Sequence, residues 1–192
     1  MIGTIPVYSL APLEYRLALD AASVWLARSA PLLLRCDQPA LQFECLQRLS
    51  PGHSPPWRGV LWLEPGHLTW VTVLVDLTAQ LQPGARLAVL LSLTPTRQLL
   101  EPCTWSGDLL GWRPGGLALL RQALKEQGFI VNTAQAFHGG QSLLWSAVSR
   151  LAHLLRRRAQ ADRLEFTARL CYIQPLERSW GPTCTLILAH RP

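Results

Sequence analysis

Residues 77–92 read Leu77-Thr78-Ala79-Gln80-Leu81-Gln82-Pro83-Gly84-Ala85-Arg86-Leu87-Ala88-Val89-Leu90-Leu91-Ser92. The leucines before Gln82 are spaced as on one face of a helix, Pro83-Gly84 is a turn dipeptide, and the apolar run after Arg86 is typical of a buried strand. The stretch therefore predicts a helix that ends near Gln82, a turn, and a strand over 86–93. A helix followed by such a strand is the second half of a βαβ unit, which implies a parallel strand before it.

The sequence upstream of this stretch also alternates between helical and strand patterns. Residues 11–29 predict an amphipathic helix whose buried face comprises Leu13, Leu17, Ala21, Val24 and Leu26. We expect a short apolar strand over Leu32–Leu34, a helix over Gln38–Leu49 and a second buried strand over Gly59–Leu63.

The alternation continues downstream. Residues 117–127 predict a helix that ends at Gly128, and residues 129–136 a strand. Residues 142–159 predict one long amphipathic helix, whose buried side comprises Leu143, Leu144, Ala147, Val148, Leu151, Leu154 and Leu155. A hairpin-like pair of strands over 166–173 and 183–190 closes the chain. The whole pattern predicts an α/β fold, a Rossmann-like three-layer sandwich with a mostly parallel sheet and antiparallel strands at its C-terminal edge.

Composition is that of a globular protein and narrows the class of partner. The 192 residues predict a single domain over 1–192, with 49% apolar and 16% charged residues. The net charge of +6 suits an anionic partner, but no aromatic residues interleave with basic ones as in a single-strand binding groove, so nucleic acid is not expected. The five cysteines form no Cys-x-x-Cys pair and the histidines no helix-face pair. We therefore expect a cytoplasmic protein without a metal site, a signal peptide or a membrane span.

Several short motifs follow one another in the order found in class I S-adenosylmethionine-dependent methyltransferases. They are the strand over 60–63, the helix before Pro83-Gly84, the strand over 87–91, the helix over 117–127, Gly128-Phe129 and the closing strand over 185–189. The chain resembles this family over residues 58–192. The resemblance implies a Rossmann-like sheet and, if the chain is active, S-adenosylmethionine as its cofactor.

The residues before 58 depart from that family. Its members carry a glycine-rich turn after the first strand, because only glycine lets the backbone approach the cofactor closely. Here the first strand leads into Arg35-Cys36-Asp37-Gln38-Pro39, which contains no glycine. The interval before Val60 is also too short for two further strands and their helices. The resemblance therefore implies a degenerate, abridged cofactor half, with Cys36, Asp37 and Glu64 as the cofactor-binding candidates if any cofactor binds.

Glu64 and His67 are the candidate catalytic residues, because they follow a central strand where open α/β sheets bind ligands. Glu64 could accept a proton, and His67 could act as a base near neutral pH. The alternative is an ordinary strand-to-helix turn. Asp37 has the alternative role of a helix N-cap, and Cys36 that of a small buried residue.

The strongest candidate for a contact surface is basic and comprises Arg150, Arg156, Arg157 and Arg158. The alternative is that these arginines only complement a helix macrodipole. We expect an interaction or regulatory scaffold that has lost catalysis and that meets a protein partner, either a second copy or another chain. Two alternatives stay open: an active class I methyltransferase with an atypical cofactor loop, and a peripheral membrane or complex-assembly factor that uses the basic helix.

Overall fold

The fold is built on an open, mixed α/β sheet. The computed structural model describes residues 13–36, 45–46, 48–52, 54–93, 109–181 and 184–192. Six strands lie in the order β1-β2-β3-β6-β4-β5. Their bounds are β1 Leu32–Arg35, β2 Trp57–Leu63, β3 Leu81–Ser92, β4 Ile130–Phe137, β5 Ile173–Pro175 and β6 Cys184–His190.

The strand directions show where the sheet departs from a parallel one. β1, β2 and β3 pair in parallel, and β6 pairs antiparallel with both β3 and β4, so β4 runs in the same direction as β1–β3. β5 pairs antiparallel with β4 at the edge. The strand expected over 183–190 is confirmed as β6 within the described residues, but its expected pairing with a strand over 166–173 is wrong. β6 is almost wholly buried and lies between two strands, whereas the three-residue β5 ends in Pro175 and suits an edge.

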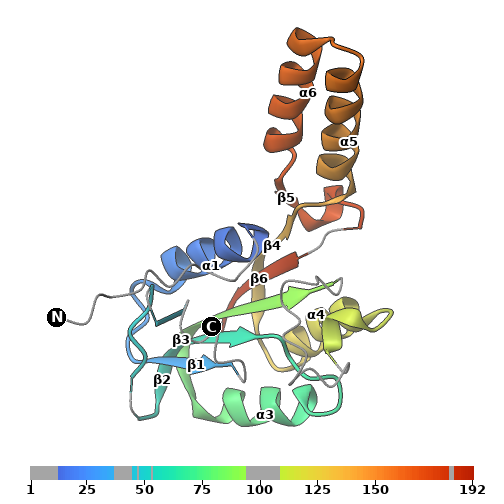
Figure 1. Cartoon of the computed structure of the whole chain (residues 1–192). Coiled ribbons are helices and arrows are strands. Elements are labelled where there is room, and N and C mark those ends of the chain that lie inside the picture. Colours follow the sequence, from blue (N-terminus) through green and yellow to red (C-terminus); the bar gives the residue numbers. More distant parts are fainter. Residues whose placement is uncertain (1–12, 37–44, 47, 53, 94–108, 182–183) are drawn as a thin grey trace, which may run out of the picture.

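Helices cover both faces of the sheet (Figure 1). α1 (Leu13–Leu26) packs on one face against the side chains of Leu61, Leu90 and Leu186. α3 (Trp70–Gln80) and α4 (Gly116–Glu126) pack on the other face against Val60, Val89 and Ile187. Alternate residues of the central strands thus enter two different cores. This double burial explains why the strands are continuously apolar rather than alternating. Short 3₁₀ turns occur at Leu110–Trp112 and Leu176–Arg178.

The stretch around Pro83-Gly84 folds as its sequence predicts. α3 ends at Gln80, and Gly84 has a left-handed φ of +77°. Trp57 pairs with Leu81 and Gly59 with Arg86, so Gln82–Ala85 form an outward excursion within β3. The Gly84 N–H donates to the Arg191 carbonyl, which anchors this excursion to the end of the chain. The helices over 11–29 and 117–127 and the strands over 32–34, 59–63 and 129–136 are also confirmed within the described residues, whereas most of 38–49 lies outside them.

The buried face expected for α1 is only partly right. Leu26 is buried, and Leu17 and Ala21 pack half-buried against the core, but the other two expected residues face solvent. Leu13 is 51% and Val24 78% exposed. The residues that face the sheet are Tyr15, Ala18, Leu19, Ala22 and Leu26. Both sets have helical spacing, so periodicity alone does not choose between them. The small Ala18 and Ala22 let the helix approach the sheet closely, and that packing decides the orientation.

The single long helix expected over 142–159 and the strand expected over 166–173 are also wrong. α5 (Gly140–Leu154) and α6 (Arg158–Leu170) form an antiparallel helical hairpin that stands away from the sheet (Figure 1). The turn between them has Arg156 at φ +59°. The Arg157 N–H donates to the Ala152 carbonyl and the Arg156 N–H to the His153 carbonyl. These are the two bonds of a Schellman motif, a helix end at which glycine is usual. Because no glycine or proline stands here, the sequence carries no local signal for the end of α5.

Candidate functional site

The carboxyl ends of the parallel strands bring several polar side chains together. Cys36 follows β1, Glu64 follows β2, and Ser92 ends β3. β6 runs the other way, so its first residue, Cys184, lies beside Ser92 at the same edge. Open α/β sheets bind ligands at this edge, which makes it the first place to look for a site.

Glu64 is held in a specific geometry. Its φ of +50° is left-handed, a conformation that costs a non-glycine residue about 1 kcal/mol. The turn directs the carboxylate to the end of β3, where Oε1 accepts hydrogen bonds from the Ser92 N–H at 3.0 Å and the Ser92 hydroxyl at 2.7 Å. The Glu64 N–H donates to the Leu90 carbonyl at 2.9 Å. The hydrogen bonds of this carboxylate therefore join the end of β2 to the end of β3.

Tyr15 of α1 packs next to Glu64. Its side chain belongs to the core and is 1% exposed. Burial raises the pKa of Glu64 to about 7. The hydrogen bonds from Ser92, and to a smaller extent the proximity of the Tyr15 hydroxyl, lower this pKa. Burial and then the Glu64 charge raise the pKa of Tyr15. Within the described part of the chain, the Tyr15 hydroxyl has no hydrogen-bond partner of regular geometry.

The thiols around Glu64 are buried as well. Cys36, Cys45 and Cys184 are at most 6% exposed. Burial, followed by the charges of Glu64 and Glu14, raises the pKa of Cys184, which keeps its thiol protonated near neutral pH. A reactive thiol needs a lowered pKa and access to solvent. Cys184 therefore behaves as a core residue, and the burial of Cys36 favours the same interpretation.

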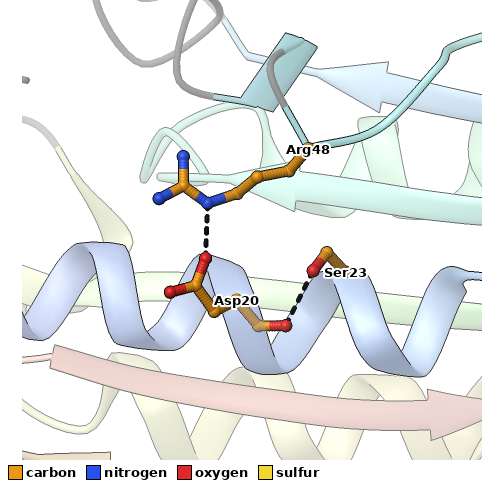
Figure 2. Close-up of polar contacts among 3 residues, drawn as sticks. All are labelled: Asp20, Ser23 and Arg48. Atoms are coloured by element: carbon orange, nitrogen blue, oxygen red, sulfur yellow. Dashed lines mark hydrogen bonds and ion pairs between the residues drawn. The ribbon is translucent and has the colours of Figure 1, made fainter.

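Polar contacts hold α1 in place along its whole length, from the carboxyl edge of the parallel strands at Glu14 to their amino ends at Trp25. At its start, the Tyr172 hydroxyl donates to Glu14 Oε2 at 3.1 Å. In the middle, Arg48 Nε lies 2.6 Å from Asp20 Oδ1, and the Ser23 hydroxyl donates to the Asp20 carbonyl (Figure 2). At its end, Arg86 donates to the Trp25 carbonyl at 2.8 Å. An exposed pair such as Arg48–Asp20 adds at most about 1 kcal/mol, so these contacts orient the helix more than they stabilise it.

Among the described residues at this edge, the side chains that could bind S-adenosylmethionine are already engaged or buried. The carboxylate of Glu64 accepts hydrogen bonds from Ser92, and Tyr15 and the thiols of Cys36, Cys45 and Cys184 are buried in the core. Cys36 and Glu64, two of the expected cofactor ligands, are brought to one edge, whereas Asp37 lies outside the described residues. His67 lies in the turn before α3, and no hydrogen bond within the described residues joins it to Glu64.

The arginines expected to form a contact surface lie on the hairpin. Arg150 is on α5, and Arg156, Arg157 and Arg158 form the turn and the start of α6. All four are exposed. The leucines expected to be buried on this segment are exposed beside them, because α5 buries only Gly140, Ser142, Ser149 and Ala152.

Tyr15, Ser92 and Cys184 are the partners of Glu64 that sequence reasoning missed. A signal for Ser92 was present, since it ends the strand parallel to the one that precedes Glu64. Tyr15 and Cys184 had no comparable signal, because their positions depend on which face α1 presents and on where β6 enters the sheet.

No known family model matches the chain, and no curated protein sequence matches it. Among the described residues, no helix is long and apolar enough to cross a membrane. Within the same residues, no three His, Cys, Asp or Glu side chains are grouped as metal ligands.

Proposed function

We propose that this chain is a methyltransferase-like, Rossmann-like domain that has lost catalysis and acts as an interaction scaffold in the cytoplasm. One observation carries the proposal: the α5–α6 hairpin presents its large apolar side chains to solvent, while Glu64, Cys36 and Cys184 at the carboxyl edge of the sheet are buried or hydrogen-bonded within the chain. We further propose that the hairpin is the part of the scaffold that meets a partner.

The strand order supports the Rossmann-like part of the proposal. β2, α3 and β3 form a βαβ unit, with one core on each face of the sheet. The three strands in which the family resemblance was found, β2, β3 and β6, are neighbours in one sheet. Within the described residues β1 is the edge strand beside β2, which accords with an abridged first half.

The surroundings of Glu64 support the loss of catalysis. A catalytic carboxylate must reach a substrate, but this one bridges two strands and lies beneath a helix fastened to the sheet. Tyr15, at 1% exposed, packs in the core beside this carboxylate.

An active methyltransferase with an atypical cofactor loop is the second candidate. The raised pKa of Glu64, about 7, favours it, because a carboxyl group with such a pKa is suited to proton transfer near neutral pH. The two candidates differ in whether the methyltransferase cofactor or its product binds.

Calorimetric titration with S-adenosylhomocysteine separates them, because this product binds without turnover. We expect no heat of binding even at high ligand concentration. Micromolar binding that is lost in Glu64→Gln and kept in Glu126→Gln, an exposed glutamate of α4, would overturn the scaffold proposal. The matched substitution removes the same charge elsewhere, so it controls for a change in net charge.

A further inference from the structure

The α5–α6 hairpin buries small side chains and exposes large apolar ones, whereas the rest of the described chain buries most of its large apolar side chains. Its internal contact consists of small side chains, with Ser142 and Ser149 of α5 donating hydrogen bonds to the carbonyls of Ala168 and Ala161 of α6 at 3.0 and 2.9 Å. Small residues let the helices approach closely but bury little apolar surface. The large side chains face outward, and the exposed fraction is 45% at Leu143, 55% at Leu151 and 80% at Leu154. The most exposed of these leucines therefore lies at the tip.

Three consecutive arginines, Arg156, Arg157 and Arg158, lie at the same tip of the hairpin. Arg156 occupies the left-handed position of the Schellman motif, where glycine would be unstrained. Arg157 is the N-cap of α6 and Arg158 its first residue, and positive charge at a helix N-terminus is unfavourable. The C-terminus of α5 at the same tip favours positive charge, so the two helix dipoles oppose each other and give no net reason for three arginines here. Among the described residues, none of their guanidinium groups has an ion-pair partner, since the ion pairs in this region join Arg169 to Glu165 and Arg121 to Glu177.

The charge of the hairpin identifies the kind of partner. Residues 140–173 contain six arginines and two acidic residues, Asp162 and Glu165, a formal excess of four positive charges out of +6 for the whole chain. A second copy would bring the same positive hairpin against it, and like charges oppose that contact. A nucleic acid would match the arginines but would leave Leu154 and Leu155 in water. An anionic lipid bilayer satisfies both, because its headgroups take the arginines and its acyl boundary takes the leucines.

We propose that the tip of the α5–α6 hairpin docks on an anionic lipid bilayer. Leu154 and Leu155 enter the boundary between headgroups and acyl chains, and Arg156, Arg157 and Arg158 lie among the lipid phosphates. α5 has 15 residues and is therefore about 22 Å long, so the sheet stands off the surface by a similar distance. This inference rests on the proposed scaffold function and names the partner of its hairpin.

Vesicle flotation with the full chain tests the inference. Vesicles of phosphatidylcholine alone are compared with vesicles containing about one third phosphatidylglycerol. We expect binding to the anionic vesicles only, and loss of most of it in high salt, because salt screens exposed charges. Arg156→Gln/Arg157→Gln/Arg158→Gln should weaken the partition coefficient roughly 100-fold at low salt, since each basic residue near an anionic surface contributes about fivefold. Leu154→Ser/Leu155→Ser should weaken it roughly tenfold or more.

Two matched variants control for general changes in charge and hydrophobicity. Arg28→Gln/Arg35→Gln/Arg178→Gln removes the same charge from exposed positions outside the hairpin. Leu68→Ser/Leu119→Ser removes two leucines that are 81% and 50% exposed on the sheet domain, close to the 80% and 60% of Leu154 and Leu155. Both controls should bind anionic vesicles like the unaltered chain.

The inference is overturned if anionic vesicles bind no better than neutral ones, or if the matched variants lose as much binding as the hairpin variants. It is also overturned if sedimentation shows a dimer that Leu154→Ser/Leu155→Ser converts to a monomer, or if an oligonucleotide binds through Arg156–Arg158 while vesicles do not. Titration with S-adenosylhomocysteine reports on the scaffold function independently. Vesicle failure without cofactor binding removes only the lipid partner, whereas cofactor binding removes the scaffold proposal itself.

Discussion

α1 and α5 are leucine-rich amphipathic helices of 14 and 15 residues, yet they use their apolar side chains in opposite ways. α1 buries Tyr15, Leu19 and Leu26 against the sheet, each at most 2% exposed. α5 buries only Gly140, Ser142, Ser149 and Ala152 and exposes its leucines. An apolar stripe on a helix thus shows that something is to cover it, but not that the cover lies in the same chain.

The largest expected effect on the free energy of unfolding comes from truncating one leucine in each of the two helices. Leu19→Ala should lower the free energy of unfolding by about 2–5 kcal/mol, because it leaves a cavity in the core beneath α1. Leu154→Ala should change it by less than about 0.5 kcal/mol, since the side chain packs against little. Urea denaturation of both variants measures the two values. A large loss in Leu154→Ala would mean that the hairpin is buried in solution, for instance in a dimer.

The free energy of unfolding should depend on pH through Glu64, which lies at the carboxyl edge of the sheet and not in the hairpin. Its pKa is about 7 in the folded chain against an ordinary 4.5, so the folded state holds a proton that the unfolded state releases between these values. The free energy of unfolding should therefore fall as pH rises from 4.5 to 7, by up to about 1.4 kcal/mol per pH unit. Denaturation at several pH values measures this slope.

Substitution of Glu64 identifies the source of that slope. Glu64→Gln should flatten it between pH 4.5 and 7, because an amide does not ionise. Glu126→Gln, on the exposed side of α4, should leave it in place. An unchanged slope in Glu64→Gln would show that another group carries the proton.

The smallest expected change in stability comes from substitutions at the C-terminal ends of α4 and α5. α4 and α5 both end in a Schellman motif, with Gly128 at φ +82° in one and Arg156 at φ +59° in the other. Gly128→Ala should destabilise the chain by about 1 kcal/mol, because it introduces a Cβ into a left-handed position. Arg156→Gly should stabilise the hairpin by up to about 1 kcal/mol while weakening its binding to anionic vesicles. Thermal unfolding and flotation measure the pair, and an Arg156→Gly variant that is less stable would show that Arg156 supports the fold.

The site was predictable only in part. Glu64 and Cys36 could be placed at one edge because each follows a parallel strand, and that expectation held. Among the described residues, Glu64 is bonded to Ser92 and no hydrogen bond joins it to His67, so a catalytic role for either residue stays a prediction. Tyr15 could not be assigned, since it belongs to one of two faces of α1 that have the same helical spacing.

Most of the elements follow from local sequence. The helix, Pro-Gly turn and strand over 70–92, and the glycine that ends α4, depend on backbone preferences that a few neighbouring residues settle. The tertiary structure alone decided the insertion of β6 between β3 and β4, the face that α1 presents, and the folding back of α6 on α5. Each of these depends on contacts between residues far apart in the chain, where small side chains such as Ala18, Ser149 and Ala161 allow close approach. Periodicity records which residues share a face of a helix, but only packing determines what that face meets.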